Sequence, residues 1–373
     1  MSSSTSEAAV AERAAPAAAR TVARTIDYDV HPLVPGTAAL LPYLDDYWQF
    51  SVVDRGIESL DTISYPPNAP ISARADWRAA DGRAGASVAA VQTHVLEGLG
   101  SDIAILNCLM GVQMIYNEDM AVAFARAINT HVAREWLDRD PRLRASIVVP
   151  LQSVEKAVEE IEHWAGDPRF VQVLVLCMGE VPLGRRQFWP IYAAAARHRL
   201  PLGIHAGSSY HHPVTSLGWP SFYYEDYASQ SQGFQSQLAS LVCEGVFGKF
   251  PDLRVVLIES GVTWLPAFSW RLTKFWFGVR SEVPWVKEPP TELIRRHVRL
   301  TAQPLDGPRD AEDLARAVEH LGSDEMLLYA SDYPHWQFDG DAVLPAGLPP
   351  ALVEKMKRDN PLRTYPRLQE TVS

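Results

Sequence analysis

The stretch Thr25-Ile26-Asp27-Tyr28-Asp29-Val30-His31 decides how the rest of the chain is interpreted. It has the length and composition of one short β-strand, in which successive side chains point to opposite faces. Asp27, Asp29 and His31 are therefore expected on one face, with the three intervening side chains on the other. Because charged groups are costly to bury unless they are paired or bound to metal, this pattern favours the first strand of a barrel with a metal ion at its centre. A surface strand with one polar face is the alternative.

The composition of the chain limits the classes of protein to which it can belong. Its 373 residues, 47% of them hydrophobic, suffice for one large α/β barrel or two medium domains. A net charge of −11 argues against a nucleic-acid or anionic-membrane surface, and no run of about 18 apolar residues predicts a membrane span. Three widely spaced cysteines fit a reducing compartment. We therefore expect a cytoplasmic protein whose partner is a small molecule.

Strand-like and helix-like segments alternate along the chain. The predicted strands cover residues 25–31, 102–109, 146–151, 171–176, 202–206, 254–259, 298–301 and 326–332. The predicted helices cover residues 118–137, 153–165, 188–198, 232–247, 265–277, 309–320 and 350–358. Strict alternation is typical of parallel strands, and eight such units predict a closed barrel.

The predicted fold is therefore an α/β protein, a (β/α)8 TIM barrel with long loops at its C-terminal face. An open doubly wound sheet is the main rival, but it normally carries a Gly-rich nucleotide-binding turn after its first strand. His31-Pro-Leu-Val-Pro-Gly36 cannot form that turn. Residues 25–373 are predicted to form this single domain. Residues 1–24, which are Ala-rich and lack the apolar core of a secretory signal, are predicted to be a disordered tail.

Residues of metal-ligand type recur where the predicted strands end. Asp29 and His31 end the first strand, His205 the fifth, Glu259 the sixth and Asp332 the eighth. The C-terminal ends of barrel strands meet on one face, where active sites lie. Two histidines with two or three carboxylates suit Zn²⁺, Mn²⁺ or Fe²⁺. The sequence therefore predicts a metal site at the C-terminal face.

Residues 25–366 resemble the amidohydrolase superfamily, and in particular its branch with aminocarboxymuconate-semialdehyde decarboxylase and the resorcylate decarboxylases. The resemblance is carried by these segments: Asp29-Val-His31, Gly203-Ile-His205-Ala, Tyr329-Ala-Ser-Asp332-Tyr-Pro-His335-Trp and Asn360-Pro-Leu-Arg-Thr-Tyr365. It implies one divalent metal ion, with zinc as the first expectation and manganese or iron as alternatives. The implied ligands are Asp29, His31, His205 and Asp332. One ion rather than two is expected, because the end of the fourth strand, Leu176-Cys-Met-Gly179, has no bridging lysine.

The sequence departs from the family at the end of the sixth strand, where Glu259 stands in place of the usual histidine. In decarboxylase members that histidine is thought to handle protons. Glu259 could bind the metal, act as a base, or stay protonated through burial. His335 is predicted to support Asp332, and a loop histidine without a role is the alternative.

The departure at Glu259 makes a metal-dependent hydrolase the favoured function. A metal-activated water would attack a small amide or lactone, Asp332 would accept its proton, and Glu259 would pass the proton to the leaving group or orient the substrate. One alternative is a lyase, a non-oxidative decarboxylase of a phenolic or enoic acid. The other is a metal-free barrel that serves as a non-catalytic scaffold.

Two aromatic-rich segments, 32–83 and 210–227, are expected above the metal and predict a pocket for an aromatic or amphipathic substrate. Trp48, Trp219 and Tyr224 are the predicted contact residues, and Arg55 or Arg74 could bind a substrate carboxylate. The alternative is that these aromatic side chains pack against a second copy of the chain. A homodimer is expected on that ground.

Overall fold

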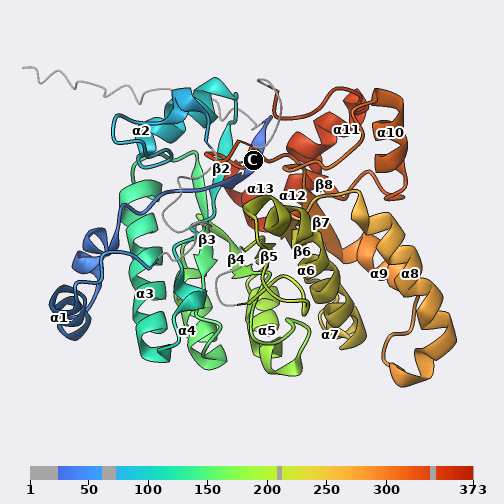
Figure 1. The fold of residues 1–373 in the computed structure, drawn as a ribbon, viewed down its shortest axis with the longest axis horizontal. Coiled ribbons are helices and arrows are strands. Elements are labelled where there is room, and N and C mark those ends of the chain that lie inside the picture. The colour runs from blue at the N-terminus through green and yellow to red at the C-terminus, as the bar shows by residue number, and fades with distance from the viewer. Residues whose placement is uncertain (1–23, 61–72, 208–211, 337–341, 373) are drawn as a thin grey trace, which may run out of the picture.

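The computed structural model describes residues 24–60, 73–207, 212–336 and 342–372. Eight parallel strands follow one another around a barrel in chain order (Figure 1). Their bounds are β1 Ile26–Val30, β2 Ile103–Leu106, β3 Leu143–Val148, β4 Phe170–Leu176, β5 Leu202–His205, β6 Val255–Ile258, β7 Val298–Thr301 and β8 Leu327–Leu328. The last strand returns to the first, because the backbone N–H of Tyr28 donates to Tyr329 (3.1 Å) and that of His31 to Tyr333 (2.7 Å). The predicted (β/α)8 barrel is confirmed.

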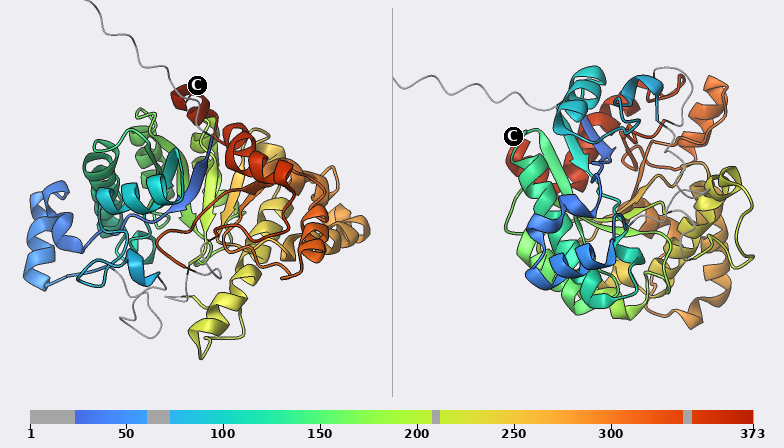
Figure 2. Two further views of the ribbon diagram at one scale, coloured as in Figure 1. Left: turned by 90° about the horizontal axis from the view of Figure 1, so that it is seen from above. Right: turned by 60° about the vertical axis from the view of Figure 1, so that its left-hand side comes forward.

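Helices alternate with the strands and cover the outside of the barrel (Figures 1 and 2). They are α1 Asp46–Arg55, α2 Val88–Val91, α3 Glu118–His131, α4 Val154–Trp164, α5 Trp189–Arg197, α6 Tyr223–Cys243, α7 Val246–Lys249, α8 Trp264–Val279, α9 Pro290–His297, α10 Ala311–Glu319, α11 Pro350–Glu354, α12 Asn360–Thr364 and α13 Pro366–Val372. Short π-helical segments extend three of them, α2, α3 and α11, over Gln92–Gly98, Val132–Leu137 and Lys355–Asp359. Each main helix buries one apolar stripe against the sheet, as α3 does with Phe124 and Ile128. None of the described helices is both long enough and apolar enough to cross a membrane.

Two segments that the sequence predicted as loops contain helix. Within residues 32–83, α1 begins where Asp45 accepts a hydrogen bond from the Trp48 N–H (2.9 Å), and it ends at Gly56, whose φ of 61° is the left-handed cap that favours glycine. Helix α6 begins at Tyr223 instead of residue 232, and acidic residues in its first turn complement the helix dipole. The remainder of the first segment at 61–72, and residues 208–211 before α6, lie outside the described residues.

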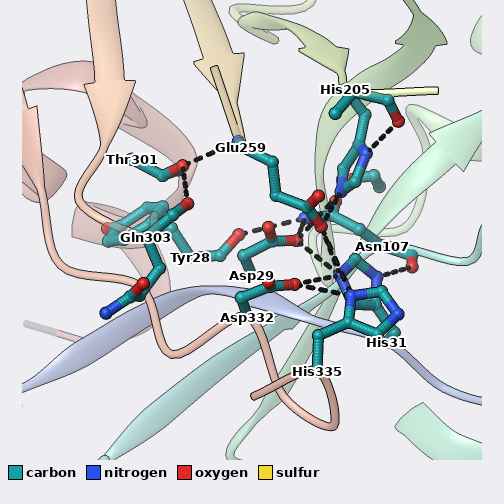
Figure 3. Close-up of polar contacts among 12 residues, drawn as sticks. Tyr28, Asp29, His31, Asn107, His205, Glu259, Thr301, Gln303, Asp332 and His335 are labelled. Carbon is teal, nitrogen blue, oxygen red and sulfur yellow. Dashed lines mark hydrogen bonds and ion pairs between the residues drawn. The ribbon is translucent and has the colours of Figure 1, made fainter. Parts of the chain in front are cut away.

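The alternation expected for β1 is interrupted. The pairing with β2 shifts between Asp27 and Val30, which marks a β-bulge. Asp27 does not join the cluster at the strand end, because its Oδ1 accepts from the backbone N–H groups of Ser331 (2.9 Å) and Asp29 (3.3 Å). Asp29 lies within the shifted stretch and His31 follows the strand, and the side chains of both point into the cluster (Figure 3).

A buried network of polar side chains inside the barrel is hydrogen-bonded to Asp29 on the first strand. Ser146 Oγ donates to Asn107 Oδ1 (2.6 Å), and Gln172 Nε2 donates to Ser146 Oγ (2.9 Å). Asn107 Nδ2 then donates to Asp29 Oδ1 (2.8 Å). Gly203 leaves room for the Gln172 side chain, because a Cβ there would lie 2.5 Å from its amide. The network therefore holds Asp29 in one orientation.

The predicted disordered tail, residues 1–24, falls almost wholly outside the described residues. Arg24 is described, and its backbone N–H donates to Asp102 Oδ2 (2.7 Å) beside the start of β2. The single domain over residues 25–373 stays a prediction.

Candidate metal centre and active site

Six ligand-type side chains converge at the C-terminal ends of four strands (Figure 3). Asp29 and His31 end β1, His205 ends β5, Glu259 follows β6, and Asp332 and His335 follow β8; five of the six are buried and His335 is largely so. The convergence arises because parallel barrel strands point their C-terminal ends to one face. The sequence predicted this meeting of strand ends, and the structure places all six residues there.

Glu259 lies at the middle of the cluster. Its Oε1 is 3.3 Å from His31 Nε2, 3.3 Å from His205 Nε2 and 3.5 Å from His335 Nδ1. Asp29 Oδ1 lies 3.4 Å and 3.5 Å from the same Nε2 atoms of His31 and His205. Asp332 Oδ1 lies 3.1 Å from His31 Nε2 and 2.9 Å from His335 Nδ1. The sixth strand therefore contributes the most central group, which the sequence had left without a fixed role.

The two strand-end histidines are oriented as metal ligands. Nδ1 of His31 lies 3.0 Å from the Asn107 carbonyl, and Nδ1 of His205 lies 2.6 Å from the Ala206 carbonyl. A carbonyl only accepts, so each Nδ1 carries the proton and donates. In the neutral ring, Nε2 then presents its lone pair to the cluster, as in metal sites where a backbone carbonyl fixes the tautomer.

The backbone is strained at both carboxylates that follow β6 and β8. Glu259 has φ 57° and Asp332 has φ 58°, the left-handed region that residues other than glycine rarely adopt. The backbone N–H of Glu259 donates to Thr301 Oγ1 (3.0 Å), which helps to hold that conformation. Such strain costs about 1–3 kcal/mol per residue and gathers at functional sites.

The donor set fits a divalent metal ion. Two groups each bring four ligand atoms within 4.8 Å of one another: Asp29, His31, His205 and Glu259, and His31, Glu259, Asp332 and His335. Three buried atoms, His205 Nε2, Glu259 Oε1 and Asp29 Oδ2, make no hydrogen bond to any described residue. Buried polar atoms are normally satisfied, and an ion would satisfy these. The first group contains Glu259 where the sequence predicted Asp332, and Asp332 instead groups with His335.

The pKa values of the two carboxyl groups at these strained positions are shifted in opposite directions. Burial raises the pKa of Asp332 to about 6, and the neighbouring charge of Glu259 adds to the rise. Burial alone would raise the pKa of Glu259, but His205, His31 and His335 together hold it well below its usual range. Glu259 is thus an anion throughout the physiological range, whereas Asp332 can keep a proton.

Metal binding should release protons. Burial lowers the pKa of His31 and of His205, but the nearby carboxylates outweigh it and raise both above the ordinary value. In the metal-free protein these rings therefore hold protons near neutral pH, and a ligand must lose its proton. We expect Mn²⁺ affinity to rise at least tenfold from pH 6 to pH 8. Calorimetry in buffers of different ionisation enthalpy should show about one proton or more released per ion; pH-independent affinity with no release would contradict this.

The four predicted substrate-contact residues do not gather at this cluster. Trp48 and Arg55 lie on α1, at the edge of the molecule beyond α3 (Figures 1 and 2). Trp219 and Tyr224 are 54% and 83% exposed. Trp48, Arg55 and Tyr224 lie in helices α1 and α6, whose turns decide which way they face, whereas Trp219 lies in the segment before α6.

Arg74 lies beside the segment that carries His335. Its guanidinium lies over the rings of Trp77 and Trp336, 5.1 Å and 4.6 Å from their centres, and donates to Asp76. The neighbouring Ala73 pairs with the backbone of His335.

Two tyrosines of α6 were missed by the sequence analysis. Tyr223 and Tyr227 are one helical turn apart, with ring centres 4.7 Å from each other. Burial raises the pKa of both hydroxyls, and the charges of Glu259 and Asp332 raise them further, which places both tyrosines near the cluster. Their i, i+4 spacing would have identified them had the helix been predicted to begin at residue 223.

A profile of the amidohydrolase family matches residues 26–367, nearly the whole described barrel. The chain belongs to this amidohydrolase family. The predicted resemblance is therefore confirmed.

Relatives of known activity are decarboxylases. Gamma-resorcylate decarboxylase of Rhizobium sp. (strain MTP-10005) is 26% identical over 264 residues, 65% of this chain and 75% of that protein. An amidohydrolase from Mycobacterium avium subsp. paratuberculosis K-10 has a similar structure, with TM-score 0.68 and 22% identity over 91% of this chain and 97% of that one. A dihydroxybenzoic acid decarboxylase from Polaromonas sp. JS666, with bound manganese and the inhibitor 2-nitroresorcinol, has TM-score 0.63 and 19% identity over 91% and 96%. These relatives support the decarboxylase alternative better than the favoured hydrolase.

Proposed function

We propose that this amidohydrolase-family protein is a divalent-metal-dependent, non-oxidative decarboxylase of a hydroxylated aromatic acid. The observation that carries the proposal is the raised pKa of Asp332, about 6, within a buried metal-type cluster. Decarboxylation requires a proton to be delivered to carbon, and a carboxyl that stays partly protonated near neutral pH is suited to deliver it. Hydrolysis would instead need a group that removes a proton from water.

Asp29, His31, His205 and Glu259 would hold the ion, since they form one of the two four-donor groups. When bound, the metal supplies Lewis-acid binding of the substrate carboxylate and the adjacent phenolic oxygen. A set with two carboxylates suits Mn²⁺ at least as well as Zn²⁺, and a structural relative was described with manganese. Manganese is therefore our first choice, in place of the zinc expected from the sequence.

Asp332 is the proposed proton donor. It gives its proton to the ring carbon that bears the carboxylate. The bond between this ring carbon and the carboxylate carbon then breaks, its electron pair stays in the ring, and CO₂ leaves. The balance is aryl carboxylate plus one proton to arene plus CO₂. Burial alone would lower the pKa of His335, but Asp332 and Glu259 outweigh it and raise this pKa to about 10. The cationic ring, with Nδ1 2.9 Å from Asp332 Oδ1, would stabilise the carboxylate left after the transfer, and solvent would return the proton to Asp332. Glu259 stays ionised and cannot act as the acid.

We expect the Tyr227 hydroxyl to contact the substrate beside these carboxylates. Tyr227→Phe should lower kcat/KM by about tenfold, since one hydrogen bond to a charged group contributes about 1.5 kcal/mol. The bound metal should be unchanged. Tyr224→Phe is the matched control, because Tyr224 is in the same helix and exposed. Equal activity of the two variants would exclude this contact.

The proposed activity is tested by a panel of substrates. Manganese-loaded protein is incubated with dihydroxybenzoates, aryl amides and aryl lactones, and products are separated by chromatography. We expect phenols from the acids and no cleavage of amides or lactones. Cleavage of the latter without loss of CO₂ from any acid would support the hydrolase instead.

A further inference from the structure

A cavity of about 230 Å³ lies at the C-terminal ends of β2, β3 and β4. Gln113 follows β2, Leu151 follows β3, and Leu176 ends β4 in its wall. The six residues of the metal-type cluster come instead from the ends of β1, β5, β6 and β8. The cavity thus occupies the side of the C-terminal face that supplies none of these ligands.

The wall of the cavity continues from the strand pair that carries His205. Leu176 pairs with His205 in the register of β4 and β5, and the backbone N–H of Cys177 donates to the His205 carbonyl (2.7 Å). Gly207, two residues beyond His205, also lines the cavity. The cavity therefore adjoins the strand pair that carries His205.

One part of the cavity wall is apolar, while polar side chains such as Gln152 and Gln187 form the rest. Ile115, Leu151, Leu176 and Met178 line it and are only half-buried, although they lie at or just beyond strand ends. The amide of Gln113 is already engaged: its Nε2 donates to the Leu174 carbonyl (3.2 Å) and its Oε1 accepts from the Leu176 N–H (2.7 Å). It braces the wall and leaves the apolar side chains to meet a ligand.

The charge of the lining selects against anions. Glu118 and Glu180 are its acidic residues and both are exposed, whereas His212 is its one basic side chain and no lysine or arginine occurs among the described residues that line it. A carboxylate in this space would be repelled by like charge. The volume far exceeds the ~15 Å³ that one water requires and approaches the ~300 Å³ of small ligand pockets.

We propose that this cavity binds an uncharged, mainly apolar substituent of the substrate. The substrate is then an aromatic hydroxy acid with an extension of roughly six to ten heavy atoms, whose carboxylate lies at the cluster while the extension fills the cavity. The position of the carboxylate rests on the proposed function; the occupancy of the cavity rests on its own shape and charge.

Kinetic comparison of three acids tests the proposal. They share one hydroxybenzoate ring and carry no extension, a six-carbon alkyl extension, or an extension of equal length that ends in a carboxylate. We expect kcat/KM for the alkyl acid to exceed that of the parent by at least tenfold, and the anionic extension to give no gain. Met178→Trp, which fills the cavity, should bring the alkyl-to-parent ratio close to one. Leu217→Trp, at a position 93% exposed, should leave that ratio unchanged.

The charge at the rim is tested by the double variant Glu118→Gln, Glu180→Gln. It should raise kcat/KM for the anionic acid at least threefold relative to the alkyl acid, because only the anion is repelled. An unchanged preference would show that the two glutamates do not select against charge, and would overturn that part of the proposal.

Binding of a 4-alkylphenol, which has no carboxylate to lose, separates this inference from the proposed function. Saturation-transfer NMR should detect the alkylphenol on the metal-loaded protein, and Met178→Trp should weaken its binding at least fivefold. If no acid is decarboxylated but this binding occurs, the cavity proposal stands and the proposed function falls. If the parent acid is decarboxylated but the alkyl group brings neither tighter binding nor faster turnover, the cavity proposal is wrong.

Discussion

His205→Ala should bind less than a tenth of an equivalent of metal and lose at least about 10³-fold in activity. The loss is expected because the variant removes a ligand whose Nε2 lies within 3.5 Å of both Asp29 and Glu259. Stabilisation of transition-state charge by a metal amounts to several kcal/mol, and each 1.36 kcal/mol corresponds to a factor of ten. Metal content by mass spectrometry and turnover are measured on the same sample.

His320→Ala is the matched control for that experiment. His320 is exposed and contacts Trp270 on α8, which contributes no residue to the cluster. It should retain full metal content and activity. If His205→Ala kept its activity without metal, the metal-free scaffold or a metal-independent reaction would have to be considered again.

Glu259→Gln and Asp332→Asn should fail in different ways. Glu259 is the central donor and an anion, so its amide variant should weaken Mn²⁺ binding by about 100-fold, a loss of nearly 3 kcal/mol. Asp332, the proposed acid, should keep the metal when changed to Asn but lose about 10²–10⁴-fold in kcat. Both are measured by Mn²⁺ titration, followed with electron paramagnetic resonance, and by turnover at saturating metal.

The opposite result would assign the opposite roles. If Glu259→Gln kept its metal affinity and lost only kcat, Glu259 would be the acid or base, as the sequence had allowed. If Asp332→Asn lost the metal, Asp332 would be the fourth ligand, as the family resemblance implied. The roles of Asp332 and Glu259 are thus distinguished by whether each variant loses metal binding or turnover.

The barrel was predictable because its signals are local and repeated. Each apolar strand, such as Val171–Leu176, is followed by a helix with an apolar stripe, and the strand-end residues Asp29, His205 and Asp332 converge once the barrel closes. The alternation of strands and helices was thus enough to predict the fold, and the positions of the strand ends were enough to predict most of the cluster.

The remaining features depend on contacts that the sequence does not display. The bulge in β1 lies beside a hydrogen bond from the Ser331 backbone N–H to Asp27, a residue 304 positions away in the chain. The central place of Glu259 depends on a left-handed backbone held by Thr301 on the next strand.

The predicted pocket residues were misplaced for a local reason. Trp48 and Tyr224 lie in helices α1 and α6, which begin within segments predicted to be loops. Once these helices form, spacing of 3.6 residues per turn decides which side chains face the barrel. That spacing directs Tyr223 and Tyr227 toward the cluster and leaves Tyr224 exposed. The homodimer expected from these aromatics stays a prediction.

The central claim is that the protein removes CO₂ from an aromatic hydroxy acid with the help of a divalent metal. The most direct measurement uses a dihydroxybenzoate labelled with ¹³C in its carboxyl group, with manganese-loaded protein in D₂O. We predict labelled CO₂, a phenol with one deuterium at the former carboxyl position, and loss of both on chelation. Unchanged acid with fully metal-loaded protein, across the dihydroxybenzoates and their alkyl-extended forms, would contradict the account.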